Sequence, residues 1–175
     1  MINNIKAQIW IETVIYTLIA LIMIGAVLSF IKPKIQELQD KVIIDQSIKV
    51  LEDINNIILS IENIPGNQRL IELGIKKGLL KIDGAEDKIF FEIESAYEYS
   101  EPGENYSEGK LIIYTEKKGS FNMITLTRDY SKKYDIRFQN KSESKSITKS
   151  PTPYKLLISN KGKSMNKTII DLEII

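Results

Sequence analysis

Hydrophobic and polar positions divide this chain into two unlike parts. From Thr13 to Ile31 there are 19 residues without an Asp, Glu, Lys or Arg. As a helix rising about 1.5 Å per residue, this run is long enough to cross a hydrocarbon core of about 30 Å. Residues 34–63 instead repeat apolar side chains at spacings of three and four, which predicts an amphipathic helix. Together they predict one long N-terminal helix over residues 8–64, with residues 8–31 as its apolar part.

The amphipathic part has a defined apolar stripe and a defined end. Polar residues, among them Asp40, are expected on the opposite face. Pro33 follows the apolar run, and because proline removes one backbone hydrogen bond, a bend is expected there. Pro65 and Gly66 are expected to stop the helix and begin a turn. The predicted stripe consists of Ile35, Leu38, Val42, Ile44, Ile48, Leu51, Ile54, Ile58 and Ile61.

From Gln68 onward the pattern changes to short strand-like runs separated by turn residues. Seven or so strands are predicted, which suggests a small antiparallel sandwich or barrel. The predicted fold class is α+β, a long hydrophobic helix followed by a β-sandwich head over residues 67–175. Residues 100–109 and 140–152 are expected to be exposed loops, and residues 160–162 the turn of a closing hairpin. The strand-like runs are 70–75, 79–82, 88–93, 110–115, 121–127, 134–138, 154–159 and 168–174.

Composition limits the chemistry of the head. The net charge of +1 argues against a nucleic-acid-binding surface, which normally carries a clear basic excess. The chain has no Cys and no His, which excludes disulfides, thiolate chemistry, the usual zinc ligands and imidazole acid–base catalysis.

Two acidic groups remain as candidates for chemistry. Asp83, Glu86 and Asp87 share one turn region, but their spacing does not match a calcium-binding loop. Glu92 and Glu94 alternate as strand residues do, so they are expected on the wet face of a half-buried strand rather than in a cleft. No catalytic residue, metal site or cofactor is predicted, and the chain is not expected to be an enzyme.

The residues just before the apolar run form the most specific motif. Lys6-Ala7-Gln8 precedes the run, and Glu12 lies at its N-terminal edge, fifth when Gln8 is counted as first. This order resembles the processing signal, or class III signal peptide, of archaeal type IV pilin-like proteins, which include pilins and archaellins. The resemblance implies that a prepilin peptidase cleaves between Ala7 and Gln8 and that residues 1–7 form a leader.

The same resemblance implies how the mature chain works. The precursor is held in the membrane by its apolar helix, and the cleaved subunit joins identical subunits in a helical surface filament at a membrane assembly platform. Glu12 then pairs with the new ammonium group of Gln8 on a neighbouring subunit and sets the axial register. The head is implied to be immunoglobulin-like. Such a chain is a structural protein of an extracellular filament, with adhesion or motility arising from the assembly.

Other interpretations of the N-terminus remain open. The helix can be an uncleaved single-span anchor for an exported β-domain that binds an envelope partner or a ligand. A secretory signal peptide has a shorter apolar stretch, and no small-residue cleavage site follows at residues 30–33. Lys32 and Lys34 follow the run, and by the positive-inside rule they oppose the orientation that the resemblance implies. Glu12 can also be a first-turn residue favoured by the helix dipole.

Three Asn-x-Ser/Thr triplets are candidates for N-glycosylation of an exported head. Asn105 and Asn140 fall in the two predicted loops, and Asn166 precedes the last predicted strand. The alternative is chance, because a chain rich in Asn, Ser and Thr produces such triplets readily.

Overall fold

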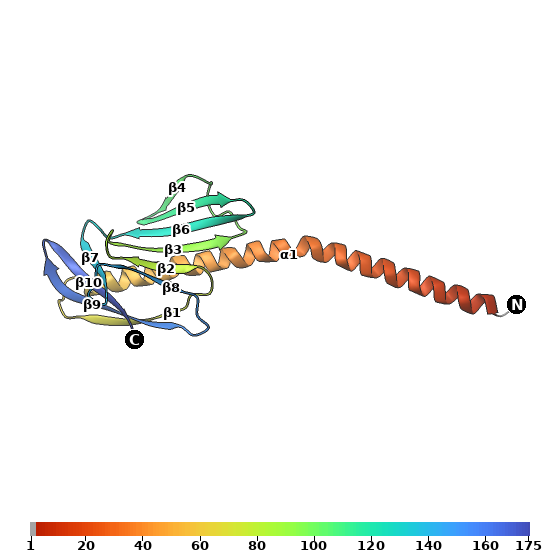
Figure 1. Ribbon diagram of the computed structural model, residues 1–175, viewed down its shortest axis with the longest axis horizontal. Helices are drawn as coiled ribbons and strands as arrows, with labels where there is room; N and C mark the ends of the chain where they lie inside the picture. The colour runs from red at the N-terminus through yellow and green to blue at the C-terminus, as the bar shows by residue number, and fades with distance from the viewer. Residues whose placement is uncertain (1–2) are drawn as a thin grey trace.

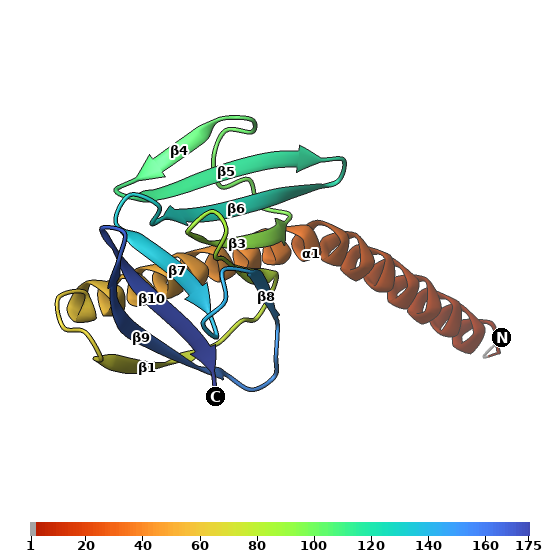
Figure 2. The ribbon, with the colours of Figure 1, turned by 60° about the vertical axis from the view of Figure 1, so that its left-hand side comes forward.

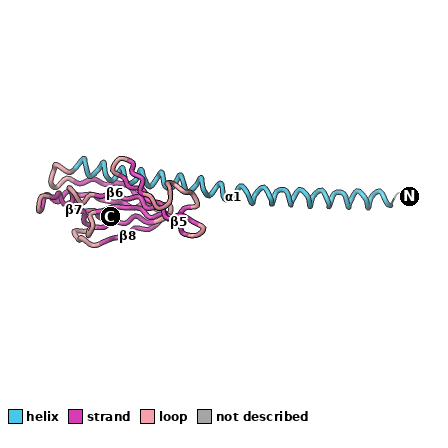
Figure 3. The backbone as a smooth tube through the Cα atoms, turned by 90° about the horizontal axis from the view of Figure 1, so that it is seen from above, coloured by secondary structure: helices cyan, strands magenta, loops and turns pink. Residues whose placement is uncertain are grey.

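The computed structural model describes residues 3–175, and side chains are described from Trp10 onward. Within that range one helix, α1 (Asn3–Ile61), is followed by ten β-strands (Figure 1). The strands gather around the C-terminal half of α1, and the N-terminal half projects away from them (Figures 1 and 3). The strands are β1 (Gln68–Leu73), β2 (Leu79–Asp83), β3 (Lys88–Ser95), β4 (Asn105–Glu108), β5 (Leu111–Lys118), β6 (Phe121–Asp129), β7 (Tyr134–Phe138), β8 (Ser144–Thr148), β9 (Tyr154–Ser164) and β10 (Lys167–Ile174).

The strands form two sheets. One has four strands in the order β1-β9-β10-β7, and the other has six in the order β4-β5-β6-β3-β2-β8. Neighbouring strands in these sheets are antiparallel, except that β7 and β10 run parallel. Buried and less buried residues alternate along β2, β3 and β6, as expected of strands with one face on a core.

The C-terminal half of α1 completes the core of the head. It contacts β1 and β9 of the four-stranded sheet and β3 and β6 of the six-stranded sheet, so one helix bridges both sheets (Figure 2). Burying one such aliphatic side chain contributes roughly 1.5–3 kcal/mol. The predicted apolar stripe is confirmed over this half, where the fully buried side chains are Ile44, Leu51, Ile54, Ile58 and Ile61.

The predicted α+β class is confirmed, whereas the immunoglobulin-like topology is not. The sheets have four and six strands and share their core with a helix, unlike two antiparallel sheets packed on each other. The parallel pair of β7 and β10 also corrects the prediction of a wholly antiparallel head. It arises because the chain leaves the four-stranded sheet after β7, forms β8 in the other sheet, and returns through β9.

Both segments predicted to be exposed loops contain a strand, so those two predictions are wrong in part. β4 lies within residues 100–109 and β8 within residues 140–152, and these strands are the two edges of the six-stranded sheet. Every residue of β4 is exposed, and Ile147 is the one buried residue of β8. An edge strand with so little buried surface shows no apolar alternation, and its polar side chains discourage pairing with other chains.

The closing hairpin turns later than predicted. Met165 and Asn166, with φ of 46° and 72°, occupy the turn, and β9 continues past Asn160. Asn160 is 1% exposed because its amide meets the end of α1. Its Nδ2 donates to the carbonyl of Ile61 at 2.8 Å and to that of Glu62 at 3.0 Å. The last carbonyls of a helix have no partner within it, so Asn160 satisfies the buried C-terminus of α1.

Replacing Asn160 by Ala is expected to lower the free energy of unfolding by about 1–3 kcal/mol, because it leaves buried carbonyls without a donor. Denaturant unfolding of the full chain in detergent, followed by circular dichroism, measures the loss. Asn105→Ala, at an exposed position of β4, is the matched control and is expected to change stability by less than about 0.5 kcal/mol. Equal losses in the two variants would contradict the role of Asn160.

A second contact ties the end of α1 to β7. Lys133 Nζ lies 2.6 Å from Glu62 Oε2, and the Tyr134 hydroxyl donates to the same oxygen. The hydrogen bond from Lys133, together with that from Tyr134, lowers the pKa of Glu62. Burial, and then the hydrogen bond to Glu62, raise the pKa of Tyr134. The contact is therefore strongest with an ionised carboxylate and a neutral phenol.

Glu62→Gln is expected to lower the free energy of unfolding at neutral pH. The size of this loss is expected to shrink as the pH falls into the acid range. The pKa of Glu62 is lower in the folded chain than its ordinary value of 4.5. Its contribution is therefore present above the unfolded pKa and is lost as the pH falls through the folded pKa. Unfolding free energies of the two chains, compared between about pH 7 and pH 3, test this. A difference that stays constant with pH would refute it.

Candidate functional site

The stalk, defined as residues 10–36 of α1, is an extended apolar surface with nothing packed on it. Every residue of the stalk is exposed, over a length of about 40 Å at 1.5 Å per residue (Figure 1). An apolar surface of this size marks a site of contact with a membrane or with other protein. The large apolar side chains exposed on it are Trp10, Ile11, Val14, Ile15, Tyr16, Leu18, Ile19, Leu21, Ile22, Met23, Ile24, Val27, Leu28, Phe30, Ile31 and Ile35.

Among the described residues, α1 is the one helix whose length and composition would let it cross a membrane. Its most apolar 18-residue window has a mean hydropathy of 2.6, and none of that window is buried. The core helix of a soluble protein can have a similar composition, but it buries those side chains. The stalk could therefore anchor the chain in a membrane.

Two hydroxyl groups on the stalk donate to the helix itself. Thr17 Oγ1 donates to the carbonyl of Thr13 at 2.8 Å, and Ser29 Oγ donates to that of Gly25 at 2.9 Å. In lipid, polar groups must find partners within the segment because no water is available. These side chains thus add little polar cost to burying the stalk in lipid or among other helices.

The stalk is continuous with the part of α1 under the head. Pro33 lies inside the helix, which does not end there. Figure 2 shows that the helix changes direction between the stalk and the head. Proline removes a backbone hydrogen bond and kinks a helix, so Pro33 accounts for the bend expected from the sequence.

The predicted apolar stripe does not continue below Ile44. Ile35, Leu38 and Val42 are 48%, 66% and 53% exposed, so this part of the prediction is wrong. The buried residue at this level is Asp40, which the sequence pattern placed on the polar face. Asp40 faces the head because it lies four positions before Ile44 and so continues the buried face of α1, whereas Ile35, Leu38 and Val42 are out of phase with that face.

Asp40 fixes the point where α1 enters the head. It is 3% exposed, and one of its carboxylate oxygens lies 2.5 Å from Lys77 Nζ. The other oxygen accepts a hydrogen bond from the N–H of Ala96 at 2.7 Å. The helix is thereby joined to the β1–β2 loop and to the segment after β3. A buried carboxylate needs such partners, since desolvation without them is costly.

A basic groove lies beside this entry point. Lys32, Lys76, Lys77 and Lys149 line it, with Asp40 as its acidic residue. Lys32 directly follows the uncharged run, so the groove lies at the level where a membrane-spanning segment would end. Lysines at that level suit the interface between hydrocarbon and headgroups, where long side chains reach the polar region.

The residues of the predicted processing site belong to α1, but the side chains of Lys6, Ala7 and Gln8 lie outside the described part of the chain. Glu12 is described, and it is exposed on the stalk. Gln8 and Glu12 are four positions apart in one continuous helix, so they share a helix face. The pairing of Glu12 with a neighbouring subunit stays a prediction.

The three candidate glycosylation sites are accessible. Asn105 in β4, Asn140 after β7 and Asn166 in the β9–β10 turn are all exposed. The asparagine of each triplet is therefore open to solvent, and glycosylation of these sites stays a prediction.

Two of the acidic residues weighed for chemistry, Asp83 and Asp87, have structural partners. Asp83 Oδ1 accepts the N–H of Ala85 at 3.1 Å, which shapes the β2–β3 turn. Asp87 receives a hydrogen bond from Lys167 Nζ and another from the N–H of Ile136, each at 2.8 Å, and so joins that turn to β7 and β10. Glu94 is exposed on β3, as predicted for the wet face of a strand.

Comparison with known proteins leaves the chain without an assigned relative. No family model, no curated protein and no solved structure matches it.

Single-cysteine variants can test whether the stalk enters a bilayer, since the chain has no Cys of its own. In intact vesicles carrying the full chain, Leu21→Cys is expected to resist a membrane-impermeant maleimide until detergent is added. Ser120→Cys, in the β5–β6 turn of the head, is the matched control and is expected to react from one side of the membrane. Equally fast labelling of both in intact vesicles would show that the stalk is not in the bilayer.

Proposed function

We propose that this chain is a structural subunit of a type IV pilin-like cell-surface filament, made as a membrane-anchored precursor. The observation that carries the proposal is a stalk exposed on all sides that continues, without a break, into the core of the head. A helix of this kind can lie in lipid before assembly and among identical helices afterwards. Close packing of apolar side chains then replaces contact with lipid.

The N-terminal motif supplies the assembly chemistry in this proposal. Cleavage between Ala7 and Gln8 creates an ammonium group at Gln8. A carboxylate among apolar helices is costly unless a cation compensates it, and the ammonium of a neighbouring subunit provides that cation for Glu12. The pair specifies the axial step between subunits, because a subunit shifted along the filament leaves both charges unmatched.

The head suits an exported structural subunit. It packs one helix against two sheets around a continuous apolar core, and it exposes the asparagine of each of the three Asn-x-Ser/Thr triplets. The resulting filament would present heads outward and stalks inward, in the extracellular medium. An exported β-domain that keeps an uncleaved anchor and binds an envelope partner is the alternative. Lys32 and Lys34, which follow the apolar run, do not separate the two, because both export the head and the positive-inside rule opposes that orientation in each.

The mass of the N-terminal peptide tests the proposal. In material sheared from the cell surface, the native chain is expected to begin at Gln8. Glu12→Gln is expected to be cleaved normally but to remain in the membrane fraction, because the neutral side chain no longer matches the ammonium group. Glu37→Gln is the matched control, as Glu37 pairs with Lys34 of its own helix and is expected to leave assembly unchanged.

Two outcomes would overturn the proposal. If the leader is retained through Lys6 and Ala7 in every cell fraction, the chain is instead a β-domain with an uncleaved membrane anchor. If the Glu12→Gln chain enters sheared filaments as efficiently as the unaltered chain, the charge pair is not required for assembly.

A further inference from the structure

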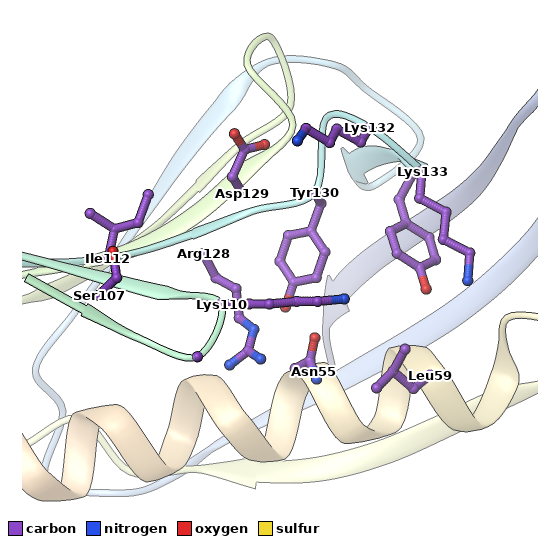
Figure 4. A pocket seen from close by; sticks show the side chains of 12 residues that line it. Asn55, Leu59, Ser107, Lys110, Ile112, Arg128, Asp129, Tyr130, Lys132 and Lys133 are labelled. Atoms are coloured by element: carbon purple, nitrogen blue, oxygen red, sulfur yellow. The ribbon is translucent and has the colours of Figure 1, made fainter.

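A cleft lies on the head near the C-terminal end of α1, far from the entry point of the stalk. Its walls come from α1, from the turn between β4 and β5, and from the loop after β6 (Figure 4). Its volume is about 450 Å³, which is within the usual range of small-molecule sites. Leu59 and Ile112 give it apolar walls, and Asn55 contributes an amide from the helix.

Basic side chains dominate the cleft. Lys110, Arg128, Lys132 and Lys133 all line it. Lys133 is neutralised by Glu62, at 2.6 Å, which leaves three cations without an ion-pair partner among the described residues. The acidic residue of the lining is Asp129, whose Oδ1 accepts the N–H of Ser131 at 2.8 Å. Figure 4 shows the Asp129 carboxylate pointing away from the Arg128 guanidinium.

Two buried donors in this cleft have no partner in the described part of the chain. Tyr130 is 5% exposed, and its hydroxyl makes no hydrogen bond. The Nε of Arg128 is likewise buried and unpartnered. Figure 4 shows both side chains extending from β6 and its end toward α1, into the space crossed by Lys110. Leaving a buried donor unsatisfied costs about 1–3 kcal/mol, so two at one place require an explanation.

We infer that this cleft binds an oxyanion, a carboxylate or a phosphoryl group carried by a small ligand. Arg128 donates to it from the guanidinium, whose planar set of N–H groups matches two oxygens at once. The Tyr130 hydroxyl donates a further hydrogen bond. Lys110 and Lys132 add positive potential at the mouth, and Leu59 and Ile112 contact the apolar part of the ligand. The inference holds whether or not the chain forms filaments, because the cleft belongs to one head.

The inference is tested with the full chain in detergent, using inorganic phosphate and acetate as probes and chloride at equal ionic strength as reference. A ligand that binds only the folded chain raises its melting temperature. Phosphate or acetate is therefore expected to raise the melting temperature of the chain above its value in chloride. The larger shift identifies the ligand group as phosphoryl or carboxylate, and calorimetric titration with that probe gives its affinity.

Variants distinguish specific binding of the anion in the cleft from non-specific attraction of anions to a basic surface. Tyr130→Phe removes only an unpartnered hydroxyl, so it is expected to melt no lower than the unaltered chain in chloride, yet to bind the anion more weakly. Arg128→Met is expected to weaken binding about tenfold or more. Lys117→Gln, in the β5–β6 hairpin, removes one exposed charge elsewhere and is expected to bind normally. Equal melting in all three salts, or unaltered affinity in both cleft variants, would overturn the inference.

Discussion

One helix in two environments is the constraint on which the rest of this structure depends. The C-terminal half of α1 is buried by both sheets, while the stalk exposes apolar side chains in every direction. Neither sheet could close its core without the helix, and the helix has no cover of its own over the stalk. The chain therefore has a folded head joined to an apolar segment whose exposure to water is unfavourable. Where the chain can function depends on whether lipid or other protein covers that segment.

Polar contacts at the two ends of the buried half keep these environments separate. Asp40 binds Lys77 and the N–H of Ala96 where the helix enters the head. Asn160 and Lys133 engage the other end, through the last carbonyls and Glu62 respectively. The apolar stripe alone would permit the helix to slide by a turn along the sheets, since isoleucines repeat along it. Directional bonds at both ends fix one position, and so fix the length of stalk that projects.

The features that could be predicted from the sequence are those that repeat. Isoleucines at helical spacing from Ile44 onward and alternating strands such as β3 and β6 bury one face each, so periodicity reveals them. The edge strands β4 and β8 bury almost nothing and leave no periodic signal. Asn160 resembles a turn residue in sequence, because only the fold brings the helix end to it. Asp40 lies one turn before Ile44 and so continues the buried face, but its charge is typical of a polar face, and the sequence does not reveal the partners that allow its burial.

The cleft was hidden from sequence for a further reason: its parts come from three separate segments. Asn55, Lys110 and Arg128 are unremarkable surface residues when each is taken alone, and they converge only because β4 and β5 turn back over α1. This convergence has a spatial consequence. Between Ile31 and Leu59 the helix rises about 40 Å, so the cleft is held far from the end of the apolar run. If the stalk lies in a bilayer or a filament core, the cleft faces the medium beyond it, where a dissolved anionic ligand can reach it.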